Sequence, residues 1–494
     1  MGFIHRLFRS STPGPSAPYE AAGIGRRMVR WMVGMVGPNN ALSSTLDSLR
    51  NRARSLVRNN TYAAAAVERI TANTIGTGIK PQSMVQDENL KNAIQQLWWD
   101  WVDEADADGL VDFYGMQALA MRSVVASGEV FIRMRPRFMS DGLSVPLQLQ
   151  VLESEQCPVD KNEVLTSGNI IRCGIEFNAI GKRVAYWMWR YHPGDTTGTE
   201  KGPNELVRIP AEDIRHVYIP LRPGQLRGEP WLVRALIKLR DLDAYDDAEL
   251  LRKKLAAMFV GFVYRPDPTG TRFGESDPDA DGISEASLEP GTLQTLNPGE
   301  EIKITEPADV GGNYEAFMRQ QARIIATSVG LLYEQLTGDY SQINDRTLRA
   351  ALHEFRRSCQ MWQHHLMVFG LCMPVWRRWL DMAVLSGAIK TKLRGRALWQ
   401  VKWTPQAWPY LHPVQDVQAQ AMSVRAGFKS RTEVVSETGY DANVVDREIA
   451  ADNARADAMG LVYESDGRTT APDWLVPASD QQPQDNQQKG GSNA

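Results

Sequence analysis

The stretch GEPWLVRALIKLRDLDAYDDAELLRKKLAAM, from Gly228 to Met258, marks the point where a β-rich pattern gives way to a helical one. Pro230 suits the first helical position, because its missing N–H would be unpaired there in any case. The helix predicted from Pro230 to Ala257 is about 40 Å long. Two apolar stripes at three-and-four spacing run along it, and the register slips between them. The first stripe is Leu232, Ala235, Leu239 and Leu242, and the second is Ala244, Ala248, Leu251, Leu255 and Met258.

Five carboxylates gather where the two stripes meet: Asp241, Asp243, Asp246, Asp247 and Glu249. Lysines and arginines flank this cluster on both sides. A solvated helix surface, with Glu249 and Lys253 paired at i,i+4, explains the pattern without any function. From the pattern alone we favour that interpretation over a functional acidic face.

The bulk numbers describe an ordinary folded protein. Its 494 residues are enough for two to four domains, and 43% of them are hydrophobic and 23% charged. The net charge of −4 argues against a protein that grips nucleic acid through overall positive charge. Four cysteines without metal-ligand spacing indicate a reducing compartment. No apolar run reaches the length needed to span a membrane.

The region before the long helix divides into three parts. Residues 1–43 mix Gly, Pro, Ser and Arg, which predicts a flexible arm. Helical patterns follow in residues 44–142, and from Gly128 to Pro220 apolar residues recur at a period of two, with short strands. The predicted fold class is therefore mainly α with an inserted β-rich subdomain, an α+β protein.

The region after it predicts mainly helix and loop. Residues 314–336 read as a one-sided helix, followed by a polar loop, TGDYSQIN, at 337–344. A long helix over 345–386 then carries an unbroken stripe at alternating spacings of four and three. We expect Asp345 to cap this helix, Pro374 to bend it and Gly387 to end it. Its stripe includes Leu348, Leu352, Phe355, Trp362, Leu366, Phe369, Trp376 and Leu380.

The last part of the chain is short helices and then a polar tail. Residues 461–494 are rich in Asp, Gln, Gly, Ser and Asn, which predicts disorder.

The sequence contains no recognised catalytic motif. A phosphate loop, a nucleophile elbow and a zinc helix are all absent. Two acidic stretches, Glu104–Gly109 and Asp277–Gly282, superficially resemble calcium loops, but both lack the glutamate at the twelfth position. We interpret the first as a plain acidic turn and the second as a mobile loop. No catalytic residue, cofactor or metal site is predicted.

Several motifs in combination resemble the lambda-type portal proteins of tailed phages. They are RNN-Y at 58–62, GTGIKPQ at 76–82, RPGQLRGEPWL at 222–232, and GLLYEQLTGDYSQIND at 330–345 followed by RAALHEFRR. The resemblance covers about residues 44–450.

The resemblance implies a portal fold with wing, stem helices, clip, tunnel loop and crown. By similarity the assignments are wing for 44–142, clip for 143–220, stem helix for 221–262, wing return with the acidic loop for 263–336, tunnel loop for 337–347, long kinked helix for 345–386 and crown for 387–460.

The resemblance also implies a function and partners. Portal proteins close into a homo-oligomeric ring, typically a dodecamer, at one capsid vertex, and the ring is the channel for DNA packaging and for DNA exit into the tail. Implied partners are double-stranded DNA without sequence specificity, the large terminase at the clip, major capsid and scaffold proteins at the wing, and a head–tail adaptor. The implied location is the virion, with the host cytoplasm during assembly.

Three hypotheses about residues follow. Part of the Asp241 to Glu249 cluster faces the bore, because cationic walls would hold a sliding polyanion. Residues Asp339, Tyr340, Ser341, Gln342, Ile343 and Asn344 form the narrowest polar ring. The stripe from Leu348 to Leu380 packs against a neighbouring subunit, because so long a stripe is more than the few other long helices of one chain can cover.

Two alternatives stay open at this point. One is another capsid-assembly component, such as a scaffold or head-completion protein. The other is a metal-dependent nucleic-acid enzyme built on the acidic loops.

Overall fold

The structure is a computed structural model that describes residues 34–195, 204–258, 262–264, 301–303, 311–410 and 412–463. Three predicted regions fall outside these residues: the arm before residue 34, the acidic loop 277–282 and the tail after residue 463. The described part is mainly helical, with its larger sheets between residues 129 and 218, which confirms the predicted fold class. None of the helices in the described ranges is both long and apolar enough to cross a membrane.

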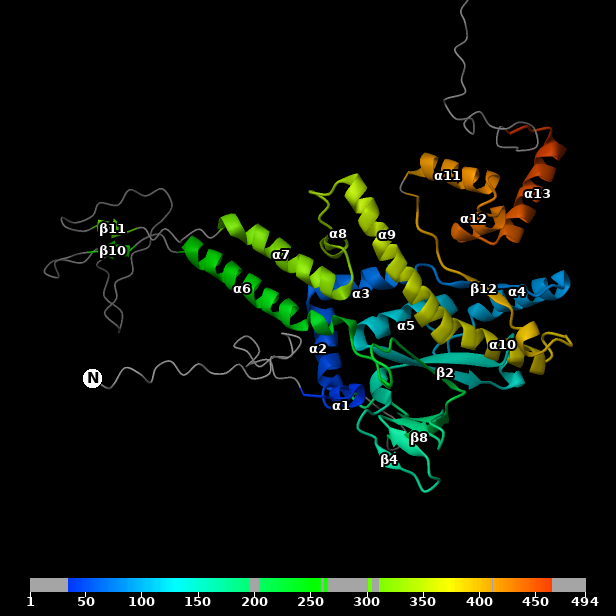
Figure 1. The fold of residues 1–494 in the computed structure, drawn as a ribbon, viewed down its shortest axis with the longest axis horizontal. Helices are drawn as coiled ribbons and strands as arrows, with labels where there is room; N and C mark the ends of the chain where they lie inside the picture. Colours follow the sequence, from blue (N-terminus) through cyan, green and yellow to red (C-terminus); the bar gives the residue numbers. More distant parts are fainter. Residues whose placement is uncertain are drawn as a thin grey trace, which may run out of the picture.

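Helices open the described chain (Figure 1). They are α1 (Pro38–Ser43), α2 (Leu46–Asn59), α3 (Thr61–Thr74), α4 (Glu88–Val102) and α5 (Phe113–Ser127). Asn60, Asp87 and Asp112 each accept backbone N–H groups at the start of a helix, as N-cap residues do. Because α1 begins at Pro38 and buries Leu42, helical structure starts earlier than the predicted residue 44.

Two antiparallel sheets make up the β-rich insertion. Strands β2 (Glu129–Pro136), β3 (Leu147–Leu152) and β9 (Ile214–Tyr218) form a three-stranded sheet in the order β3-β2-β9. A five-stranded sheet contains β4 (Glu163–Val164), β5 (Ile170–Arg172), β6 (Ile175–Phe177), β7 (Arg183–Trp189) and β8 (Leu206–Pro210). Phe131 on β2 belongs to a core shared with the second sheet, while Ile132 points into the large helical core. Strand β2 is therefore covered on both faces.

The long helix begins later than predicted. Residues Trp231–Arg234 form a short 3-10 turn, η4, and the α-helix α6 spans Leu236–Met258. Pro230 has an extended ψ of 135° and precedes η4, so it does not start the α-helix. After α6 come β10 (Phe262–Tyr264) and β11 (Glu301–Lys303), which pair antiparallel and were not predicted.

The helix predicted over 314–336 is two helices. Helix α7 spans Gly311–Val329, and α8 spans Tyr333–Thr337. Gly330 separates them with a φ of +76°, a left-handed conformation that glycine adopts without steric cost. The apolar spacing continued through the break, which is why the pattern concealed it.

The predicted long helix exists, with an unpredicted middle. It consists of α9 (Asp345–Met361), a π-helical segment η5 (Trp362–Cys372) and α10 (Met373–Leu385). The side chain of Asn344, and not Asp345, caps its start. Gly387 follows its end with a φ of +82°, as predicted. Figure 1 shows that α9 and α10 run in different directions, with η5 between them just before Pro374.

The C-terminal part adds a strand and three helices. Strand β12 (Val401–Thr404) pairs with β1 (Lys80–Ser83), so a strand lies in a region predicted to be helix and loop. The helices are α11 (Pro413–Arg425), α12 (Arg431–Glu437) and α13 (Ala442–Met459). Tryptophans from α4, α10 and β12 meet in the core: Trp98 lies 5.0 Å from Trp376 and 4.9 Å from Trp379, centroid to centroid.

Candidate functional site

Helices α6 and α7 project together from the body of the molecule (Figure 1). Aromatic contacts hold the pair: the ring of Tyr245 lies 4.8 Å from that of Phe317 and 6.2 Å from that of Tyr314. The Tyr314 hydroxyl donates to Asp246, and Lys253 lies over the Tyr314 ring. The chain therefore leaves the body along α6 and returns beside it along α7.

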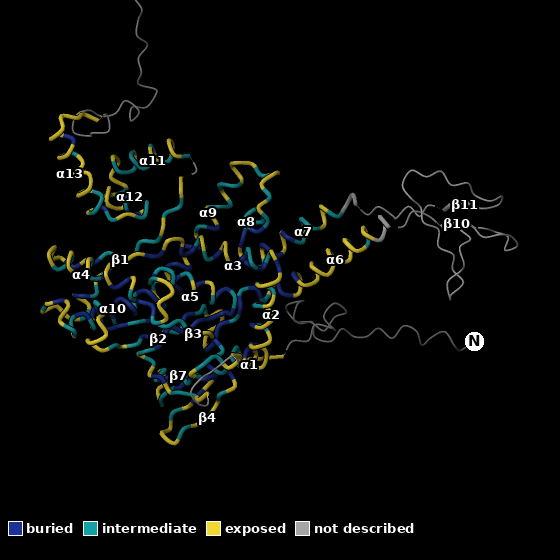
Figure 2. Tube along the Cα trace, turned by 180° about the vertical axis from the view of Figure 1, so that it is seen from behind, coloured by how far each residue is buried: buried dark blue, intermediate teal, exposed yellow. Residues whose placement is uncertain are grey.

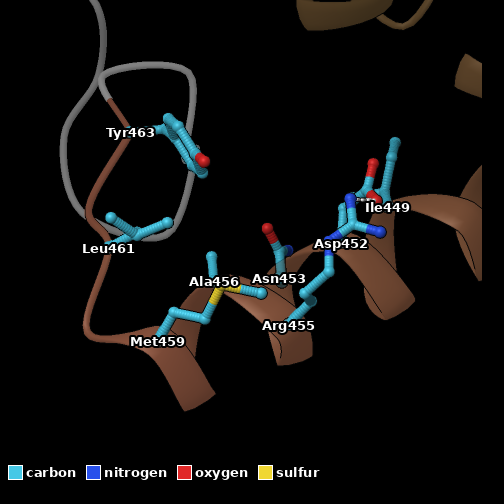
Figure 3. A pocket seen from close by; sticks show the side chains of 8 residues that line it. All are labelled: Ile449, Asp452, Asn453, Arg455, Ala456, Met459, Leu461 and Tyr463. Carbon is cyan, nitrogen blue, oxygen red and sulfur yellow. Dashed lines mark hydrogen bonds and ion pairs between the residues drawn. The ribbon is translucent and has the colours of Figure 1, made fainter.

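The two apolar stripes of α6 differ in burial. Leu239 and Leu242 of the first stripe are buried in the main core. From Asp243 to Lys254 every side chain is exposed or half-buried, as the outer half of α6 in Figure 2 shows. Among the stripe residues whose side chains the structure describes, Ala244 and Ala248 are exposed and Leu251 is 57% exposed. Ile237, which continues this stripe seven residues before Ala244, is 75% exposed.

The acidic cluster does not form one face of α6. Successive residues turn by about 100°, so side chains four apart share a side. Asp243 and Asp247 lie on one side, and Asp243 accepts a 2.7 Å hydrogen bond from Asn60 Nδ2. Asp246 and Glu249 lie toward α7, where Glu249 bonds Arg252 at 2.6 Å and lies 4.0 Å from Lys253. Asp241 lies among the residues of the second stripe. The five carboxylates therefore cannot all face one bore.

The polar loop after α8 is organised by Asp339. Its carboxylate accepts hydrogen bonds from the Tyr333 hydroxyl at 2.9 Å and from the Ser341 hydroxyl at 2.6 Å. The bonds from Ser341, together with that of Tyr333, lower the pKa of Asp339 to about 2. Asn344 caps α9, while Tyr340 is 56% exposed. Asp339 and Asn344 hold the loop ends, and the side chains of Tyr340 and Gln342 are exposed between them.

The stripe of the long helix is mostly core within one chain. Five of its eight seam candidates are buried: Phe355, Trp362, Leu366, Trp376 and Leu380. The expectation that a neighbouring subunit must cover them is therefore wrong, because helices of the same chain do so. Leu348 and Leu352 are half-buried, and Phe369 is 77% exposed.

The π-helical segment explains why Phe369 leaves the stripe. Bonding from i to i+5 widens the turn, so residues of one face recur at four and five positions instead of three and four. The buried side chains on η5 follow this wider spacing: Trp362, Leu366 and Leu371. Phe369 falls between them and turns outward. Pro374, which has no N–H for an α-helical bond, follows directly.

A buried charge network joins distant parts of the chain, and the sequence did not predict it. Arg227 Nε donates to Glu129 at 2.8 Å, the Gly228 N–H donates at 2.7 Å, and Arg50 contacts the same carboxylate. Burial alone would raise the pKa of Glu129, but the charges of Arg227 and Arg50 hold it well below its usual range. Arg227 lies in the motif RPGQLRG, which the sequence singles out. Its partner Glu129 lies about a hundred residues earlier in the chain, and no motif marks it.

His216 completes this network as a neutral ring. Its Nδ1 lies 3.3 Å from Arg183 and its Nε2 lies 2.9 Å from Glu129. Because guanidinium only donates, Nδ1 accepts and Nε2 carries the hydrogen given to Glu129. Burial lowers the pKa of His216 to about 4.

The acidic loop at 104–109 uses its carboxylates internally. Asp106 is buried and accepts backbone N–H groups from Asp108 at 3.1 Å and Leu110 at 2.9 Å. Glu104 accepts from Ser144 at 2.8 Å. These bonds make the loop an acidic turn, as interpreted from the sequence.

One group of possible metal ligands occurs within the described ranges. Glu153, Glu155 and His192 bring ligand atoms within 4.8 Å of one another. Arg54 already pairs with Glu155 at 2.8 Å and with Glu153 at 3.2 Å. The group is therefore an ion-pair network around Arg54.

Residues 24–363 match the family model described as "Phage portal protein, lambda family". The chain belongs to this family. It is 27% identical over 430 residues to the "Probable portal protein" of Halomonas phage phiHAP-1, covering 84% of this chain and 82% of that protein. It is 21% identical to "Portal protein B" of Escherichia phage lambda, covering 89% of this chain and 90% of that protein.

A solved structure of the neck of an empty gene transfer agent particle is also similar. It is 15% identical, with a TM-score of 0.47, and the match covers 78% of this chain and 93% of that one.

Family membership confirms the resemblance found in the motifs. As a portal protein, the chain is a structural component of the virion at the portal vertex, where portal proteins assemble into rings.

Proposed function

We propose that this chain closes into a ring through the projecting α6/α7 pair, which lines the channel that DNA passes. The observation that carries the proposal is the apolar stripe of Ile237, Ala244, Ala248 and Leu251, exposed in one chain at helical spacing. Exposed apolar stripes of this kind mark surfaces that another helix covers. In a closed ring, the neighbouring copy supplies that helix.

The side of α6 next to the stripe suits the bore. Asp243 and Asp247 lie there, about 110° and 70° around the helix from the middle of the stripe and about 100° and 140° from the buried Leu242. Duplex DNA is a dense polyanion, and cations along the wall would bind it by counterion release. Carboxylates repeated in every subunit would keep the DNA sliding. Asp241 lies on the stripe side, so we assign it to the subunit contact and leave Asp243 and Asp247 as the bore candidates.

The loop after α8 is our candidate for the tunnel loop. Asp339 and Asn344 anchor its ends, and Tyr340, Ser341 and Gln342 are exposed between them. A polar loop with fixed ends can contact DNA as it moves without unfolding. Leu348 and Leu352, half-buried just beyond the loop, are proposed to contact a neighbouring subunit.

We also propose a different clip from the one implied by motif similarity. The sheets between residues 129 and 218 share their core with the helical body. The β10/β11 pair lies in the chain between the two projecting helices instead. A β-containing clip joined to two stem helices fits this pair. We propose that the large terminase and the head–tail adaptor bind there, and that the capsid and scaffold proteins bind the body. We propose a structural role for this chain, without catalysis.

Substitutions on and off the stripe of α6 test the proposal. Leu251→Asp places a charge on the stripe and should abolish rings while leaving the monomer folded, since the side chain is 57% exposed. Leu250→Asp is the matched control, because Leu250 is 53% exposed and lies about 100° around the same helix, off the stripe. Equal ring yields for the two variants, measured by sedimentation, would contradict the proposed contact.

The bore assignment has its own test. Asp247→Lys should reduce DNA packaging by the rings that form, whereas Asp160→Lys, the same charge change on the exposed β-rich insertion, should leave packaging unchanged. Packaging that is unaffected by Asp247→Lys would place this side of α6 away from the DNA.

A further inference from the structure

A cationic groove lies beside strand β9. Its volume is about 730 Å³, and it is lined by the turn before β7, by β9, and by η5 and α10. Lys182, Arg215 and Arg377 reach it from three different elements, and Glu212 is the one acidic residue among its described lining. On a chain whose net charge is −4, such a groove needs an explanation.

The positive charge in this groove is poorly compensated by the residues that the structure describes. Arg378, next to it, pairs with Asp213 at 3.2 Å. Arg215 is half-buried with an Nε that has no hydrogen-bond partner. Burial, and then the neighbouring charges of Arg378 and Arg377, lower its pKa. A carboxylate from outside would relieve these groups.

Phe369 adds an apolar element to the same groove. The π-helical register turns its side chain outward to 77% exposure, and Gly370 beside it packs against Val217 of β9. π-helical turns are rare and occur often at functional sites. The partner of this groove should therefore carry both carboxylates and an apolar side chain.

The chain itself presents such a surface at the loop between α4 and α5. Asp103 and Asp108 are exposed there, and Leu110 is 83% exposed between acidic neighbours. The N–H groups of Asp108 and Leu110 donate to the Asp106 carboxylate and fix the loop, so Leu110 is presented on a rigid turn. This is the acidic stretch that resembled a calcium loop.

The groove and the loop lie at opposite edges of the three-stranded sheet. The strand order is β3-β2-β9, and the groove is lined from β9. The loop runs beside β3, where the Ala107 N–H donates to the Leu149 carbonyl at 2.8 Å and the Leu149 N–H donates to the Ala105 carbonyl at 2.7 Å. Two different, complementary surfaces on opposite sides of a subunit are what a head-to-tail contact requires, and such contacts generate rings.

We propose that the cationic groove of one copy receives the acidic Leu110 loop of the next copy, with Leu110 against Phe369 and Asp103 and Asp108 near Lys182, Arg215 and Arg377. This inference rests on the proposed ring, and it names a second contact in that ring, separate from α6. The occupant is a second copy, because one chain carries both halves with matching charge and matching apolar centre.

Cross-linking between engineered cysteines tests the contact directly. The four native cysteines are buried, so a short bis-maleimide should react selectively at Leu110→Cys and Phe369→Cys. Rings mixed from the two single variants should give covalent dimers, and the double variant should give a ladder of higher species. Either single variant alone should give none. Rings that yield no cross-linked dimer would overturn the inference.

Charge reversal tests the electrostatic part. Lys182→Glu with Arg377→Glu should lower ring yield about tenfold or more, as should Asp103→Lys with Asp108→Lys, because like charges would meet across the contact. Combining all four changes should restore rings. Failure of that combination, with folded monomers, would overturn the inference.

The outcomes separate the two proposals. A wild-type protein that forms no rings refutes the proposed function. Wild-type rings with reversed variants that assemble normally refute this contact alone. Groove variants that keep rings but lose binding to duplex DNA would assign the groove to nucleic acid and likewise overturn the contact.

Discussion

Arg227 Nε donates a 2.8 Å hydrogen bond to the carboxylate of Glu129, and neither side chain is more than 1% exposed. This bond ties the turn before η4 to the first residue of β2. The projecting helix α6 therefore starts from a point fixed to the core of the body.

Removing Arg227 should destabilise the protein strongly. Arg227→Met leaves the buried Glu129 carboxylate with less compensation, and breaking a buried ion pair in this way costs about 3–5 kcal/mol. Urea unfolding of the monomer measures the loss. Arg222→Met, at an exposed arginine in the same motif, should change the free energy of unfolding by about 0.5 kcal/mol or less. Similar losses of unfolding free energy for both variants would contradict the stabilising role of the buried network.

His216 should make stability depend on pH. Its pKa falls from 6.5 to about 4 on folding, so between these values the unfolded chain binds a proton that the folded chain does not. Stability is therefore lost as pH falls from about 6.5 to about 4. Glu129 adds a loss only below its ordinary value of 4.5.

Replacing His216 isolates this effect. In His216→Gln the decline in unfolding free energy between pH 6.5 and pH 4.5 should become shallower, because no imidazole is left to titrate. His364→Gln, at an exposed position on η5, is the control and should retain the wild-type slope. An unchanged slope in His216→Gln would show that other groups cause the decline.

Gly228 should tolerate no side chain. A Cβ at this position would lie 2.1 Å from the carbonyl oxygen of Gly128, so backbone would have to move. Gly228→Ala should cost about 1–3 kcal/mol in unfolding free energy. Gly34→Ala has no atom within 4 Å of the added Cβ and should leave stability unchanged. Thermal melting of both variants makes the comparison.

The tryptophan cluster predicts a sharp contrast between adjacent residues. Trp98 is fully buried against Trp376 and Trp379, whereas Trp99 is 50% exposed. Trp98→Ala should lower the free energy of unfolding by about 3–5 kcal/mol, and Trp99→Ala by much less. Chemical denaturation decides this. A comparable loss at Trp99 would contradict the difference in burial between the two tryptophans.

Local periodicity predicted much of the fold, because it reports which side of an element is apolar. The strands after Gly128 and the helix from Asp345 to Leu385 follow from it. Periodicity could not reveal the helix break at Gly330, since the apolar spacing continues from α7 into α8. Nor could it reveal η5, because π-helical bonding changes the period without a distinctive residue.

Which surface covers a stripe also lay beyond the sequence. Trp376 and Leu251 both sit in apolar stripes, yet one is buried by its own chain and the other is exposed. Spacing shows only that a face is apolar. The acidic residues of α6 illustrate the same limit, because which of their sides is covered depends on where α7 lies.

End-on electron microscopy of the purified protein, together with its mass in solution, tests the central claim most directly. The account predicts annular particles with a central hole and a mass that is a whole multiple of 55.3 kDa. A stable single copy of 55.3 kDa, with no annular particles under any assembly condition, would contradict it.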